Sequence, residues 1–128
     1  MKLPYAPSIE TPLFLAPMAG VSEAPFRQIC RGLGADILIT EFLSAEAIRR
    51  GIRTTLEGAE FEEIERPIGV QIYGADASGM AEAASIVTET YQPDFIDINF
   101  GCPVKKVVQR NGGSGCLRAG PSEYLHHL

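Results

Sequence analysis

The stretch of this sequence best equipped for chemistry is "NFGCPVKKVVQRNGGSGCL", residues 99–117, which holds two of the three cysteines. Cys102 stands between Gly101 and Pro103, just beyond the apolar run "FIDI". Glycine permits a sharp turn and proline stiffens the backbone that follows, so this order predicts a thiol exposed at the end of a strand. Cys116 has a simpler interpretation as a small packing residue.

The glycine run at 112–115 resembles a phosphate-binding loop only loosely. No Gly-Lys-Ser or Gly-Lys-Thr follows it, and its order is not the GxGxxG arrangement. We therefore do not expect a nucleotide phosphate to bind there.

Polar side chains inside apolar runs are a second chemical signal. Gln71 interrupts "VQI", and the carboxamide must either find a buried hydrogen-bond partner or face a ligand. Asp97 and Asn99 alternate with isoleucines, which places both on one face of a strand, although a half-buried strand explains this alternation equally well. The turn "APMAG" (16–20) has small residues whose backbone a flat ring could approach, and a tight turn is the alternative interpretation.

The charge of the chain is segregated. A net charge of −5 weighs against a nucleic-acid partner, and five glutamates crowd into residues 57–65. In contrast, residues 100–119 hold no acid and contain Lys105, Lys106, Arg110 and Arg118. This basic stretch is either a solvated loop or a surface that meets phosphates.

Four apolar runs, at 13–18, 36–40, 67–74 and 95–100, alternate with helical patterns. This alternation is typical of an α/β protein with a parallel sheet, in which ligand sites form at the carboxyl ends of the strands. Residues 52–66 are expected to be a helix end followed by a loop, and residues 105–118 a glycine-loosened loop. The expected helices are one that Ser22 caps, with Phe26, Ile29, Cys30 and Leu33 on its buried face, one capped by Ser44, one after Asp76, and one over 121–128.

The composition excludes several classes of protein. No apolar run approaches the roughly 18 residues that a membrane span needs, and the first residues lack the pattern of a secretory signal. Three cysteines without metal-ligand spacing argue against a disulfide framework and a zinc site. We expect a cytoplasmic protein with free thiols, no bound metal and no membrane partner.

Taken together, "LAPMAGVSEAPFR", "TEFLSAEAI", "PIGVQIYGAD" and "DFIDINFGCPVKKVVQRNGGSGCL" resemble the tRNA-dihydrouridine synthase family over residues 13–118. The resemblance implies an FMN-dependent oxidoreductase that reduces uridine to 5,6-dihydrouridine in tRNA, with NADPH or NADH as the reductant. It also implies that residues 1–128 are part of an FMN-binding (β/α)8 TIM barrel. The whole barrel needs about 250 residues, so four strands correspond to its first half.

The resemblance also implies residue roles. Pro17, Met18 and Ala19 would lie against the FMN ring, and Gln71 would hydrogen-bond its polar edge. Cys102 would protonate C5 of the uracil while hydride reaches C6. Asn99 would help to hold the flipped-out base, and Lys105, Lys106 and Arg110 would meet tRNA phosphates.

The sequence is compatible with two other functions. In the family, further flavin ligands and a helical RNA-binding domain lie beyond residue 128. The chain could therefore be a non-catalytic half-barrel that associates with itself or with another chain. Alternatively, the chain could belong to another flavin barrel, one that reduces a free pyrimidine.

Overall fold

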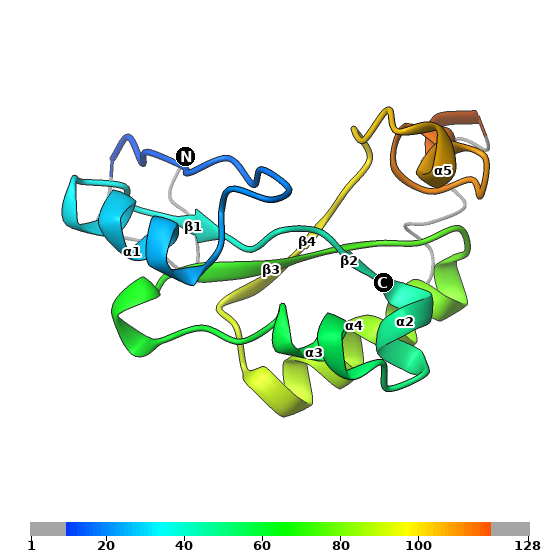
Figure 1. Cartoon of the computed structure of the whole chain (residues 1–128), viewed down its shortest axis with the longest axis horizontal. Coiled ribbons are helices and arrows are strands. Elements are labelled where there is room, and N and C mark those ends of the chain that lie inside the picture. Colours follow the sequence, from blue (N-terminus) through cyan, green and yellow to red (C-terminus); the bar gives the residue numbers. More distant parts are fainter. Residues whose placement is uncertain (1–9, 119–128) are drawn as a thin grey trace.

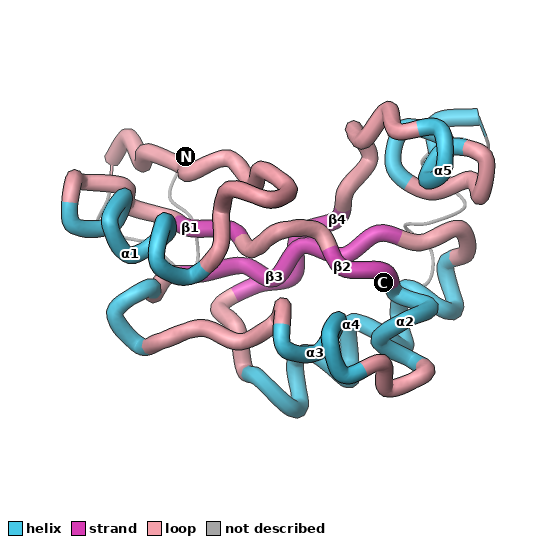
Figure 2. The backbone as a smooth tube through the Cα atoms, in the orientation of Figure 1, coloured by secondary structure: helices cyan, strands magenta, loops and turns pink. Residues whose placement is uncertain are grey.

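The computed structural model describes residues 10–118, and its strands form one parallel sheet (Figures 1 and 2). β3 (Ile68–Tyr73) lies in the centre and pairs with β4 (Phe95–Ile98) along one edge. β1 (Leu38–Ile39) and β2 (Leu43–Ser44) pair in succession along its other edge. The predicted α/β class with parallel strands is therefore confirmed. The helices are α1 (Ala24–Gly32), α2 (Ala45–Arg49), α3 (Arg53–Glu57), α4 (Ala77–Tyr91) and α5 (Lys105–Val108), with 3-10 turns at Glu63–Glu65 (η1) and Gly113–Arg118 (η2).

The first predicted strand, 13–18, is wrong as a full strand. It forms a single parallel bridge, Phe14 with Ile37, flanked by a hydrogen bond from Leu15 N to the Ile37 carbonyl. Pro12 and Pro17 bracket this run, and because proline lacks an N–H they limit the length of the ladder. The second predicted strand is likewise shortened to β1, with β2 following it.

The hydrophobic core lies between the sheet and the helices on one side of it. Figure 1 shows α2, α3 and α4 together on that side. Val70 and Ile72 of β3 point into this layer, because alternate residues of a strand face the same way. The buried members of the core are Leu43, Ala45, Ile48, Ala59, Val70, Ile72, Met80, Ala83 and Val87.

The predicted cap at Ser44 is confirmed, and Asp76 caps the helix predicted to follow it. The Ser44 hydroxyl accepts the N–H of Ala47 at 3.4 Å at the start of α2. The Asp76 carboxylate accepts the N–H of Gly79 at 2.6 Å at the start of α4. Each cap satisfies a backbone donor that has no partner inside its own helix.

The predicted buried face of α1 is confirmed only in part, because Phe26 and Cys30 are half-buried. Ile29 and Leu33 are exposed, with relative accessibilities of 62% and 83%, whereas Arg27 is buried. The reason is an ion pair in which Arg27 Nε lies 2.5 Å from the Glu65 carboxylate of η1. This pairing turns the polar side of α1 inward, against the preference that the apolar spacing alone predicts.

The predicted helix over 121–128 lies outside the described residues. Within residues 10–118, no helix is long and apolar enough to cross a membrane.

Candidate active site

Three polar side chains, one on β3, one on β4 and one just after β4, form a hydrogen-bonded chain. We call it the amide chain (Gln71, Asp97 and Asn99). Gln71 Nε2 donates to Asp97 Oδ2 at 2.6 Å, and Asn99 Nδ2 donates to Gln71 Oε1 at 2.9 Å. Asn99 Oδ1 then accepts the backbone N–H groups of Gly101 at 3.1 Å and Cys102 at 2.9 Å. The amide chain therefore links the centre of the sheet to the backbone of the predicted catalytic cysteine.

The strand register places these side chains together. Gln71 is the direct partner of Asp97, and Gly69 is the partner of Phe95. A Cβ atom on Gly69 would lie 2.2 Å from Cε2 of Phe95, so the glycine makes room for that ring. By alternation, these residues and Asn99 share the face opposite the one that packs on α4.

Thr40 holds Gln71 from the neighbouring edge of β3. Its buried hydroxyl accepts the Gln71 N–H at 3.1 Å and donates to the Glu41 carbonyl at 3.0 Å. The contact falls between β1 and β2. In this segment the chain has one residue more than the facing part of β3, so a bulge interrupts the ladder. The Thr40 hydroxyl therefore replaces a backbone carbonyl as the acceptor of the Gln71 N–H. Gln71 is held by hydrogen bonds of both its backbone and its side-chain amide.

The backbone of Cys102 is also held from the far end of its loop. Ser114 donates its N–H and its hydroxyl to the Cys102 carbonyl, each at 3.0 Å. A Cβ atom on Gly113 would lie 2.7 Å from the same carbonyl oxygen. The thiol itself is partly buried, and its sulfur makes no hydrogen bond to any residue in the range 10–118.

The segment after Cys102 is more ordered than the sequence indicates. The expectation of a glycine-loosened loop over 105–118 is wrong, because α5 and η2 occupy most of it. Gly112 and Gly113 are buried, since their lack of side chains allows tight packing. Cys116 is buried, and its sulfur donates to the Asn111 carbonyl at 3.1 Å. The interpretation of Cys116 as a packing residue is confirmed.

Ser22 holds the turn that contains the predicted flavin contacts. Its hydroxyl accepts the Met18 N–H at 2.8 Å and donates to the Met18 carbonyl at 3.1 Å, so Ser22 is not the cap of α1. Pro17 is half-buried, while Met18 and Ala19 are exposed. The turn therefore presents a small, accessible surface.

Glu41 links this turn to the amide chain. Its carboxylate accepts the Val21 N–H at 3.1 Å, and its carbonyl accepts the Thr40 hydroxyl that also binds Gln71. The turn and Gln71 are thus connected through one intervening strand end.

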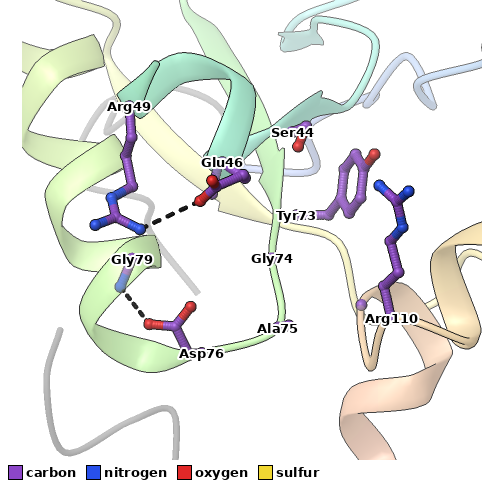
Figure 3. Close-up of a pocket in the computed structure, with 11 residues that line it drawn as sticks. Ser44, Glu46, Arg49, Tyr73, Gly74, Ala75, Asp76, Gly79 and Arg110 are labelled. Atoms are coloured by element: carbon purple, nitrogen blue, oxygen red, sulfur yellow. Dashed lines mark hydrogen bonds and ion pairs between the residues drawn. The ribbon is translucent and has the colours of Figure 1, made fainter.

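The basic residues lie beside the cysteine loop. Lys105 and Lys106 are exposed on α5, and Arg110 lines a pocket of about 220 Å³. Figure 3 shows Arg110 and Tyr73 on one side of this pocket and Arg49 on the other. Within the described part of the chain, the side chains of Lys105, Lys106 and Arg110 form no ion pair.

Arg49 differs from Arg110 because its charge is compensated. It lies 2.6 Å from Glu82 and 3.3 Å from Glu46. The hydrogen bond to Glu82 is the main reason that the pKa of Arg49 is raised above its ordinary value. Arg110 is therefore the pocket's uncompensated positive charge among the described residues.

Hydrogen bonds connect Gln71, Asn99 and the backbone of Cys102 directly. Within residues 10–118, the turn at 17–19 and the lysines of α5 make no direct hydrogen bond to these three residues. Sequence reasoning missed the roles of Thr40 and Ser114, for which no local signal exists. The alternation of Asp97 with Asn99 indicates that both lie on one face of a strand. The hydrogen bond between Asp97 and Gln71 follows only from the register of β3 with β4.

Parallel strands, covering helices, and polar groups with a thiol at the carboxyl ends of the strands are typical of enzymes of the βα-barrel class. The sequence model of the dihydrouridine synthase family matches residues 14–122. The chain therefore belongs to the dihydrouridine synthase family, as its motifs predict.

Individual relatives agree with this assignment. A probable tRNA-dihydrouridine synthase of Aquifex aeolicus is 43% identical over 110 residues, which cover 85% of this chain and 34% of the relative. The tRNA-dihydrouridine synthase B of Pseudomonas putida is 43% identical over 116 residues, covering 89% and 34%. That of Pasteurella multocida is 41% identical over 107 residues, covering 83% and 32%. The chain spans about a third of the length of these curated relatives.

Proposed function

We propose that this chain takes part in the FMN-dependent reduction of uridine to 5,6-dihydrouridine in tRNA, with Cys102 as the proton donor. The observation that carries the proposal is the Cys102 thiol. Asn99 and Ser114 hold its backbone, yet its sulfur makes no hydrogen bond within residues 10–118. The names of the relatives support tRNA as the substrate. We propose the cytoplasm as the site of action.

The residues present fit a flavin ring. Ala19 and the exposed Met18 leave the backbone of their turn accessible to a flat ring, with Pro17 beside them. Gln71 uses one Nε2 hydrogen and one Oε1 lone pair in the amide chain, which leaves one of each for the polar edge of the ring. When bound, reduced FMN supplies the hydride for C6 of uracil, and NADPH or NADH restores the reduced form.

Cys102 completes the reduction by giving its thiol proton to C5 of the uracil. The S–H bond breaks as the C5–H bond forms, and the resulting thiolate regains a proton from solvent. Cys102 must therefore be a protonated thiol when the base arrives, unlike a cysteine that acts as a nucleophile.

Asn99 would hold the base through its remaining N–H. The Asn99 Oδ1 already accepts two backbone N–H groups, and one Nδ2 hydrogen is donated to Gln71. The second Nδ2 hydrogen is therefore the group left to donate to a uracil carbonyl. The uridine must first leave the base stack, as it does in other enzymes that act on a base in a nucleic acid. Lys105, Lys106 and Arg110, which lie beside the cysteine loop, would bind the flanking phosphates.

The experiment that tests this proposal compares two cysteine variants after purification in the presence of FMN. Cys102→Ala should keep the visible absorbance of bound flavin and form dihydrouridine at least about a hundredfold more slowly, because general acid catalysis contributes on the order of 10²-fold or more. Cys30→Ala removes a partly buried thiol on α1 and serves as the matched control. Undiminished turnover by Cys102→Ala would refute the role of this thiol.

A specific observation also favours self-association as a second candidate. Leu13 and Phe14, beside the single bridge to Ile37, are 62% and 48% exposed. Covering such apolar side chains would stabilise contact with another copy of the chain. Sedimentation should then show a dimer that Phe14→Ser weakens, and a strictly monomeric wild type would exclude this candidate.

A further inference from the structure

We propose that Asp97 is a positioning residue, which sets the direction of the amide chain that ends at the backbone of Cys102. The proposal rests on the proposed function for its consequence, since it concerns how the proton donor is presented to the base. Asp97 itself does not bond to Cys102. It acts through Gln71 and Asn99.

The direction of the amide chain follows from its two ends. A backbone N–H can only donate, so the groups of Gly101 and Cys102 fix the oxygen of the Asn99 amide on their side. An ionised carboxylate can only accept, so Asp97 fixes the nitrogen of the Gln71 amide on its side. The middle contact then has one possible arrangement, in which Asn99 Nδ2 donates to Gln71 Oε1.

The bond to Asp97 is the shortest of the chain, 2.6 Å against 2.9 Å for the next two. A charged acceptor makes such hydrogen bonds shorter and stronger than neutral ones. Gln71 is also buried, with 6% of its surface exposed, so water cannot readily replace a lost acceptor. Without Asp97, only the hydrogen bond from Asn99 Nδ2 orients the Gln71 amide, so the acceptor of Asn99 is held less firmly.

The first test follows the amide chain directly, in protein without flavin or RNA. In Asp97→Ala, hydrogen exchange at the backbone amides of Gly101 and Cys102 should accelerate about tenfold, and the side-chain amide resonances of Gln71 and Asn99 should move. Asp97→Asn keeps an acceptor oxygen and should restore most of the protection. The matched control is Asp94→Ala, which removes a carboxylate bonded to Ile68 N and Arg66 at the other end of β4.

The second test asks whether this positioning affects catalysis. Asp97→Ala should lower kcat for tRNA reduction about tenfold, with the KM for tRNA unchanged, and Asp97→Asn should recover it. A general loss of stability would instead lower the kcat of Asp94→Ala equally and would not respond to the asparagine variant.

The two proposals fail in distinguishable ways. Unchanged exchange and resonances in Asp97→Ala would overturn the positioning role, whatever the enzyme does. Altered exchange together with wild-type kcat would overturn its catalytic consequence. A wild-type protein that forms no dihydrouridine would contradict the proposed function, while the exchange measurement would still decide whether Asp97 directs the amide chain.

Discussion

Arg27 and Glu65 form an ion pair that is almost entirely removed from solvent, with 4% and 0% of their side-chain surfaces exposed. Arg27 also donates to the carbonyl of Ser22 at 2.9 Å. The same guanidinium therefore ties η1 to the segment that holds the turn at 17–20. Removing one partner of such a pair leaves a buried charge without compensation, which costs more than the pair itself contributes.

Glu65→Ala should accordingly lower the free energy of unfolding by about 3–5 kcal/mol, measured by urea denaturation. The control is Glu63→Ala, which breaks the exposed ion pair with Arg66 at 3.0 Å. Glu63 is 85% exposed, so its loss should cost no more than about 1 kcal/mol. Similar losses in the two variants would show that Arg27 is compensated in another way.

At the scale of elements, the segment formed by α5 and η2 acts as the support of Cys102. Ser114 binds its carbonyl, and Gly113 approaches it more closely than any other residue type could. Gly113 also has a φ of +54°, a left-handed conformation that side chains disfavour. The position of the thiol therefore depends on a glycine eleven positions away in the sequence.

Gly113→Ala should destabilise the protein by at least about 1–2 kcal/mol and alter the rate at which iodoacetamide alkylates Cys102. Gly101→Ala is the matched control, because it also adds one methyl group near Cys102 but meets no atom within 4 Å. That control should change stability by less than about 0.5 kcal/mol. Equal alkylation rates for Gly113→Ala and the wild type would contradict the role of this packing.

At the scale of the whole molecule, the sequence predicts those features that depend on neighbouring residues. The alternation of apolar runs predicts the parallel α/β class, and Ser44 and Asp76 cap helices through donors only three residues further on. The four motifs predict the family that the matched model confirms. All of these signals are contained within short stretches of chain.

The remaining features depend on partners far apart in the sequence. Arg27 is buried because Glu65 lies 38 residues later, and apolar spacing within α1 carries no information about that pairing. The polar side chains of Gln71 and Asp97 each require a hydrogen-bond partner, but only the register of β3 with β4 makes them partners of each other. Pro12 and Pro17 shorten the first strand despite its apolar composition.

The role of Cys102 in uridine reduction can be tested by measuring the dihydrouridine content of tRNA, position by position, in cells with and without the gene for this chain. Deletion should return at least one tRNA position to uridine. The wild-type gene should restore dihydrouridine at that position, and the Cys102→Ala allele should not. Dihydrouridine retained at every position after deletion, or restored by the Cys102→Ala allele as fully as by the wild type, would contradict this role.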